Sequence, residues 1–161
     1  MTIAVGAKLP DVTFKTMTDK GPAELKTADV FAGKTVALFA VPGAYTPTCS
    51  AKHLPSFLTH LDALKAKGVD TVACTSVNDM FVLNEWSKSQ NAAGKILFLA
   101  DGGAAFAKAI GLDVDMSAGG MGVRSRRYAM LIKDGVVKAL NVEDAPGKME
   151  KSSAEELLKA L

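Results

Sequence analysis

Short apolar runs alternate with amphipathic segments along most of this chain. The apolar runs are nearly continuous and rich in β-branched and aromatic residues, which predicts strands buried on both faces of a sheet. These strands and the helical segments between them cover, in chain order, residues 35–41, 47–67, 69–77, 79–90, 96–100 and 104–110. Because strands alternate with helices, the sequence predicts an α/β protein whose central sheet is covered by helices.

The last third of the chain predicts a hairpin and a final helix. RRYAMLI and VVKALNV flank Asp134-Gly135, and an Asp-Gly pair between apolar runs is a strong signal for a tight hairpin turn. This antiparallel hairpin would make the central sheet mixed. Ser152 and Glu155 have the spacing of a capping box, which predicts a helix over 153–160. The glycine-rich segment 117–123 is interpreted as a flexible connector.

Two helices carry further local signals. Pro55 lies inside the segment 47–67 and lacks the N–H that would bond to the carbonyl of Ala51, so we expect a kink there. The segment 79–90 begins beside Asn78 and Asp79, either of which can cap it. Its apolar residues at helical spacing, Phe81, Val82 and Trp86, are expected to pack against the sheet.

Composition places the chain among ordinary globular proteins. A length of 161 residues suits a single domain, here residues 1–161, and a net charge of +2 gives no argument for nucleic acid or an acidic membrane as partner. The first residues, MTIAVGAKLP, predict no signal or transit peptide, and no apolar run has the length of a membrane span. Two cysteines without C-x-x-C spacing make no disulfide framework, so we expect a cytoplasmic protein.

The segment PGAYTPTC, which ends at Cys49, is the clearest candidate for chemistry. Thr46 precedes Pro47, and proline is favoured at the first position of a helix, so Thr46 is predicted to be the N-cap. The Cys49 sulfur would then lie near unpaired N–H groups at the positive end of the helix dipole, a setting that favours a thiolate. From these residues alone, a reactive thiol and a small buried core residue are both possible.

PGAYTPTC is one of three informative segments, and the other two are VACTSVNDMFVLNEW and RRYAMLIKDGVVKALNVE. Together they resemble the type II peroxiredoxins, the subfamily five group of thiol peroxidases, and the resemblance runs over about residues 6–142. It implies a thioredoxin-like fold and an antioxidant enzyme that reduces hydrogen peroxide and organic hydroperoxides. The active-site pattern of that family, P-x-x-x-T-x-x-C with a distant arginine, falls on Pro42, Thr46, Cys49 and Arg127.

The resemblance implies a separate role for each of these residues. Cys49 as a thiolate would attack one peroxide oxygen and become a sulfenic acid. Arg127 would supply positive charge, the Thr46 hydroxyl would bind the peroxide oxygens, and the Pro42 ring would keep water from the sulfur. Arg127 is preferred over Arg126 because neighbours in a strand face opposite sides, and because Arg127 directly precedes YAM, as in the family.

Regeneration of Cys49 is predicted to need an external thiol. Cys74 lies in an apolar strand, where a cysteine is usually inert packing, and the segment GKMEKSSAEE lacks the C-terminal cysteine that some relatives carry. The resemblance therefore implies glutaredoxin with glutathione, or thioredoxin, as reductant, together with a homodimer and no cofactor or metal. His53, four residues after Cys49, is interpreted as an active-site neighbour or interface residue rather than a metal ligand.

One non-enzymatic alternative stays open. A thiol-based peroxide sensor or redox-regulated holdase would also need a reactive Cys49. The two hypotheses differ in turnover, because a sensor is oxidised once and then stalls.

Overall fold

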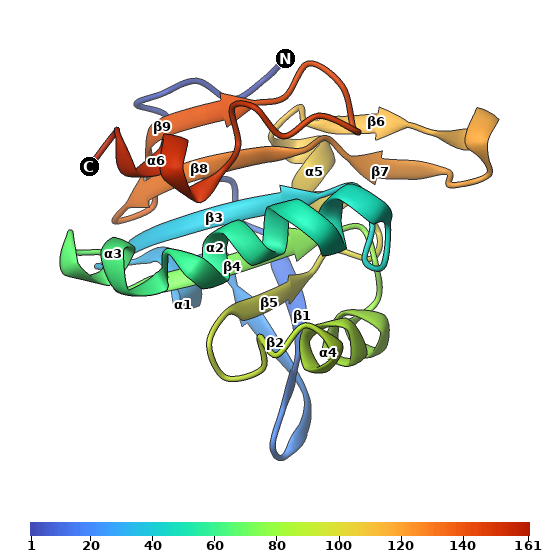
Figure 1. Ribbon diagram of the computed structural model, residues 1–161, viewed down its shortest axis with the longest axis horizontal. Helices are drawn as coiled ribbons and strands as arrows, with labels where there is room; N and C mark the ends of the chain where they lie inside the picture. The colour runs from blue at the N-terminus through green and yellow to red at the C-terminus, as the bar shows by residue number, and fades with distance from the viewer.

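A seven-stranded mixed sheet forms the centre of the computed structural model, which describes residues 1–161 (Figure 1). Its strand order is β2-β1-β5-β4-β3-β8-β9. The strands are β1 (Thr13–Thr18), β2 (Gly21–Lys26), β3 (Thr35–Val41), β4 (Thr71–Ser76), β5 (Leu97–Ala100), β8 (Tyr128–Lys133) and β9 (Val136–Val142). The strands β3, β4 and β5 run parallel, whereas β8 pairs antiparallel with β3, and β1 with β5. The predicted mixed sheet is confirmed.

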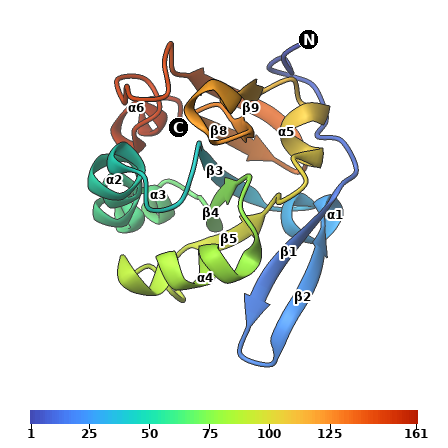
Figure 2. The same ribbon diagram turned by 90° about the vertical axis from the view of Figure 1, so that its right-hand side faces the viewer.

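Helices cover both faces of this sheet (Figure 2). They are α1 (Thr27–Phe31), α2 (Leu54–Thr59), α3 (Leu61–Ala66), α4 (Met80–Ser89), α5 (Ala105–Ala109) and α6 (Ala154–Leu158). One face carries α2, α3, α4 and α6, and the other carries α1 and α5. No helix has both the length and the apolar character needed to cross a bilayer.

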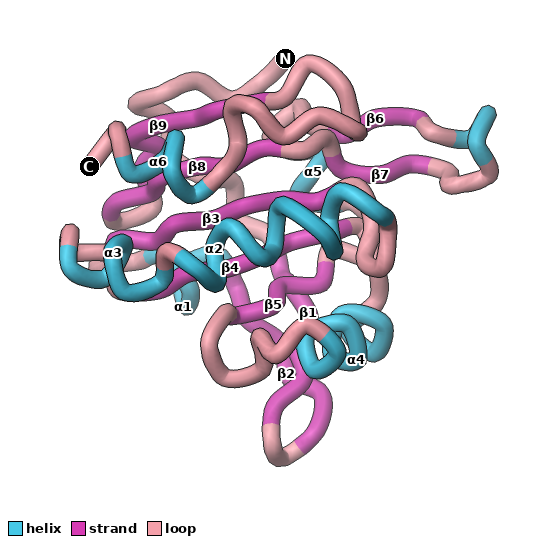
Figure 3. Tube along the Cα trace, in the orientation of Figure 1, coloured by secondary structure: helices cyan, strands magenta, loops and turns pink.

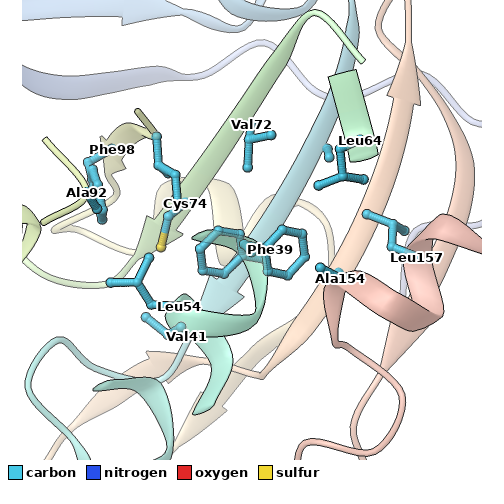
Figure 4. Close-up of a cluster of buried hydrophobic side chains, with 14 of the residues drawn as sticks. Phe39, Val41, Leu54, Leu64, Val72, Cys74, Ala92, Phe98, Ala154 and Leu157 are labelled. Carbon is cyan, nitrogen blue, oxygen red and sulfur yellow. The ribbon is translucent and has the colours of Figure 1, made fainter. Parts of the chain in front are cut away.

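Side chains of β3 alternate between the two layers of the core. Phe39 lies in the layer that also holds Leu54 of α2 (Figure 4), and its ring stacks on that of Phe57 at a centroid distance of 4.2 Å. Leu38, the preceding residue, points to the opposite layer with Phe31 and Phe106. Because both faces are buried, the strand is apolar along nearly its whole length, as its sequence pattern predicts.

The predicted helix over 47–67 is divided into three parts. A π-helical turn, η1 (Cys49–His53), comes first and is followed by α2 and α3. The Leu54 N–H bonds to the Cys49 carbonyl five residues back, because Pro55 has no N–H and its ring crowds the carbonyl of Ala51. The predicted kink therefore takes the form of this wide turn. His60, with φ −104° and ψ 13°, separates α2 from α3 without a signal in the sequence.

The predicted hairpin is confirmed, and two neighbouring predictions are corrected. Asp134 and Gly135 have φ of 49° and 75°, as a tight turn between β8 and β9 requires. The segment 117–123 is not a simple connector, because β6 (Asp113–Asp115) and β7 (Val123–Ser125) pair on either side of it (Figure 3). The cap of α6 is Ser153, whose hydroxyl accepts from the Glu156 N–H, rather than Ser152.

Of the three α4 residues predicted to pack against the sheet, Trp86 does so and Phe81 does not. Leu83 and Trp86 turn to the core, whereas Phe81 is 60% exposed and Val82 is only partly buried. The helix begins after Asp79, whose carboxylate accepts from the Val82 N–H at 2.9 Å, and its first residue, Met80, packs against the core.

Candidate active site

The junction of β3 with η1 brings the candidate cysteine into the molecule. The strand ends at Val41, and a short turn leads through Tyr45, whose φ of 65° is rare for a residue other than glycine. The chain enters helical conformation at Pro47, as predicted. Cys49 follows in the first turn with its side chain fully buried beneath the surface.

The Thr46 side chain lies against the sulfur. Its hydroxyl oxygen is 2.7 Å from the Cys49 Sγ and 2.7 Å from the carbonyl oxygen of Gly43, so its single hydrogen can be donated to either atom. As predicted, Thr46 directly precedes the first helical residue, but its hydroxyl contacts the sulfur and Gly43 rather than a backbone N–H of the helix. Only its carbonyl serves the helix, by accepting from the Ser50 N–H.

Arg127 reaches the same sulfur from the segment before β8. Its Nη2 lies 3.0 Å from the Cys49 Sγ, its Nη1 lies 3.0 Å from His53 Nδ1, and its Nε donates to the Pro146 carbonyl at 2.9 Å. Arg127 is 3% exposed, and none of the ion pairs of the structure includes it. A buried guanidinium without a counter-charge is unfavourable, and the only side-chain groups that Arg127 contacts are the Cys49 sulfur and the His53 ring.

His53 is an active-site neighbour, one of the two interpretations that the sequence allowed, but its contact with Arg127 was not predicted. Its Nε2 faces the Ser152 carbonyl at 2.9 Å, and a carbonyl can only accept, so Nε2 carries the proton. Its Nδ1 faces Arg127, which can only donate, so Nδ1 is an unprotonated acceptor. Burial lowers the pKa of His53 to about 3. The charge of Arg127 adds to this shift, whereas the hydrogen bond to Ser152 opposes it. The ring is therefore neutral. In the sequence, only the spacing of four residues between Cys49 and His53 indicated that the ring lies at the site.

The two other arginines of this region have partners of their own. Arg124 donates to the carbonyls of Met121 and Val77, and Arg126 donates to that of Glu143. Neither contacts the sulfur. The choice of Arg127, made from its place directly before YAM, therefore agrees with these contacts.

Pro42 and Cys74 lie in the core near the site. Pro42 is buried directly after β3, and its predicted action on the sulfur stays a prediction. Cys74 is fully buried in β4, among the apolar residues that Figure 4 shows around it. Burial and, to a smaller degree, the charge of Cys49 raise the pKa of the Cys74 thiol, so it is a poor nucleophile.

Comparisons with known proteins agree with this site. A family model described as Redoxin matches residues 4–158. Peroxiredoxin-2E-2, chloroplastic, of Oryza sativa subsp. japonica is 52% identical over 99% of this chain and 73% of its own length, and Peroxiredoxin-2B of Arabidopsis thaliana is 46% identical over 99% and 98%. The solved structure of reduced Prx3 in complex with hydrogen peroxide from Vibrio vulnificus is 53% identical and covers 99% of each chain, with a TM-score of 0.94. The thioredoxin-like fold is confirmed.

The names of these relatives contradict the expected cytoplasmic location. The rice protein and Peroxiredoxin-2E of Arabidopsis thaliana, 47% identical over 99% of this chain and 70% of its own length, are both named chloroplastic. The expectation is wrong because it was drawn from the number and spacing of the cysteines. Those properties belong to the redox domain and carry no information about its compartment.

Proposed function

Because this chain belongs to the peroxiredoxins and is a thiol peroxidase with antioxidant function, we propose that residues 1–161 act as one domain with Cys49 as the reacting thiol. The observation that carries this proposal is that Cys49 Sγ lies within 3.0 Å of both the Thr46 hydroxyl and Arg127 Nη2. Two donors that converge on one sulfur suit a reaction in which charge leaves that sulfur.

The proposed reaction is a displacement on oxygen. The Cys49 thiolate attacks one oxygen of hydrogen peroxide or an organic hydroperoxide, so an S–O bond forms while the O–O bond breaks. The sulfur becomes a sulfenic acid, and hydroxide or an alkoxide leaves and takes a proton from water. Arg127 and the Thr46 hydroxyl stabilise the charge as it moves from sulfur to the leaving oxygen. We assign to Pro42 the exclusion of water beside them.

Peroxide consumption by single variants tests these roles. Cys49→Ser should lose all activity, and Arg127→Gln should slow sulfenate formation by about 10²–10³, the usual loss when one such donor is removed. Trp86, the only tryptophan, donates to Ser50 beside the reacting cysteine, so stopped-flow fluorescence can report the oxidation. A wild-type rate in Arg127→Gln would remove Arg127 from the mechanism. A single oxidation without turnover would instead favour the peroxide sensor or holdase.

We propose that the reductant is glutathione with glutaredoxin, or thioredoxin. The burial of Cys74 and its raised pKa support an external thiol over an internal one. Cys74→Ser should therefore keep glutathione-supported turnover within about twofold of the native rate, as expected for a residue that only packs. If first-cycle peroxide consumption persists while turnover collapses, Cys74 is the resolving cysteine.

We further propose that the chain forms a homodimer through the rim of this site. Tyr45 and Phe81 are 54% and 60% exposed, which is unusual for aromatic residues of this size. The segments that carry them meet, because the Asn78 side chain, just before α4, accepts from the Ala44 N–H of the active-site turn. Phe81→Asp should give a monomer by light scattering. The control Val5→Asp changes an equally exposed apolar residue beside β9 and should leave the dimer intact.

A further inference from the structure

Glu143 is a buried carboxylate that has no role in the reaction described above. It follows β9 and is 3% exposed, yet no lysine or arginine forms an ion pair with it. Three backbone N–H groups donate to it instead: those of Glu150 at 3.1 Å, Lys151 at 2.8 Å and Ser152 at 2.6 Å. Burial acts to raise the pKa of Glu143, but these hydrogen bonds outweigh it and the net shift is downward, so the carboxylate stays ionised.

The segment that Glu143 holds carries two carbonyls that face the active site. The Pro146 carbonyl accepts from Arg127 Nε at 2.9 Å, and the Ser152 carbonyl accepts from His53 Nε2 at 2.9 Å. The backbone N–H of Glu143 also donates to the carbonyl of Arg127 at 3.0 Å. Every contact that fixes the guanidinium, apart from the sulfur itself, therefore depends on residues 143–152 or on His53.

We propose that Glu143 is a positioning residue for the peroxidase reaction, acting through the Pro146 and Ser152 carbonyls to aim Arg127 at Cys49. The guanidinium is planar and its donors have fixed directions. When Pro146 and His53 hold Nε and Nη1 in place, the Nη2 group can therefore point in only one direction. That orientation places Nη2 at 3.0 Å from the sulfur. In Glu143→Gln one carboxylate oxygen becomes an NH2 group, which cannot accept, so the three N–H groups no longer all have an acceptor and the segment fixes the two carbonyls less firmly. This inference rests on the proposed role of Arg127.

Glu143→Gln tests the proposal, with Glu155→Gln as the matched control. Both changes remove one negative charge in the same region, but the Glu155 carboxylate is largely exposed on α6. Glu143→Gln should slow sulfenate formation by about 10- to 100-fold, because misplacing a catalytic group by about 1 Å costs up to that much. Glu155→Gln should react at the native rate. A native rate in Glu143→Gln overturns the proposal.

The imidazole signals of His53 supply a readout that separates positioning from mere loss of stability. The chain has only two histidines, so ¹⁵N spectra of the native protein and of His60→Gln assign them. The native protein should show His53 as a fixed Nε2–H tautomer. In Glu143→Gln this pattern should change to one averaged by exchange. If the rate falls while the His53 signals stay native, the effect does not pass through the Ser152 carbonyl and the proposal fails.

A double-mutant cycle completes the test. If Glu143 acts through Arg127, Glu143→Gln should slow the Arg127→Gln protein by less than about twofold, whereas independent effects would multiply. A native rate in Arg127→Gln alone would instead defeat the proposed function of Arg127, which distinguishes the two failures. Should Glu143→Gln not fold, Glu143→Asp keeps the charge on a shorter side chain. It should slow the reaction by about 10-fold, and a native rate would overturn the proposal equally.

Discussion

At the scale of single residues, the site depends on one neutral ring that holds one permanent cation. His53 can accept from Arg127 only while its Nδ1 is unprotonated, and burial together with the charge of Arg127 keeps it so. A protonated ring would turn an N–H toward the guanidinium. The orientation of Arg127 therefore requires a histidine that does not titrate near neutral pH.

Stability should consequently fall as the pH is lowered from 7 to 5. The pKa of His53 is about 3 in the folded protein and about 6.5 when unfolded, so the unfolded state takes up a proton in this range and the folded state does not. The loss of unfolding free energy from this group is about 2 kcal/mol. Urea unfolding at both pH values should show a smaller loss in His53→Gln, because glutamine does not titrate. In the control His60→Gln, the loss of unfolding free energy that comes from His53 should stay as in the native protein.

At the scale of elements, the sequence predicted which segments meet but not how their ends are built. The apolar run of β3 and the Thr46-Pro47 pair located the cysteine at the start of a helix. They could not show that the Thr46 hydroxyl serves the sulfur, because capping and contact with sulfur compete for one group and only the tertiary structure decides between them. The strand pair β6 and β7 was missed because Ser117–Gly119 and its neighbours are rich in residues that favour loops.

The cap of α4 gives a prediction at this scale. Asp79→Ala removes the carboxylate that accepts from the Val82 N–H and should lower the free energy of unfolding by about 1 kcal/mol, measured in urea. Asp79→Ser keeps an acceptor and should lose less. The rate of peroxide consumption should stay native in both variants, because the side chain at position 79 does not contact the Cys49 sulfur. A slowed rate at full stability would show that α4 also positions η1 through the hydrogen bond from Trp86 to Ser50.

At the scale of the whole molecule, two apolar layers on opposite faces of one sheet hold the site in place. Function was predictable because the family pattern fell on Pro42, Thr46, Cys49 and Arg127 together. The network behind Arg127 was not predictable, because Glu143 and its amide partners lie in an irregular segment whose path no periodicity describes. The location was mispredicted because domain composition does not encode it.

A cavity in one of these layers should therefore lower the free energy of unfolding of the whole molecule. Phe39 is fully buried between the sheet and α2, where it contacts the rings of Phe57 and His53. Phe39→Ala should lower the free energy of unfolding by about 3–5 kcal/mol, as large-to-small core changes do. Phe39→Leu, which keeps most of the volume, should cost less than about 1.5 kcal/mol by the same measurement. Equal losses in the two variants would show that the ring stack rather than volume is decisive.

Cys49 belongs to the same apolar cluster as Phe39 and Leu54, and this membership has a cost for each turnover. Oxidation of Cys49 as proposed would add a polar oxygen to a sulfur that lies between this cluster and two donors, the Thr46 hydroxyl and Arg127 Nη2. Because a buried oxygen is unfavourable unless it is hydrogen-bonded, the new oxygen would have to stay beside these donors, and its removal by the reducing thiol would restore the native packing of the sulfur.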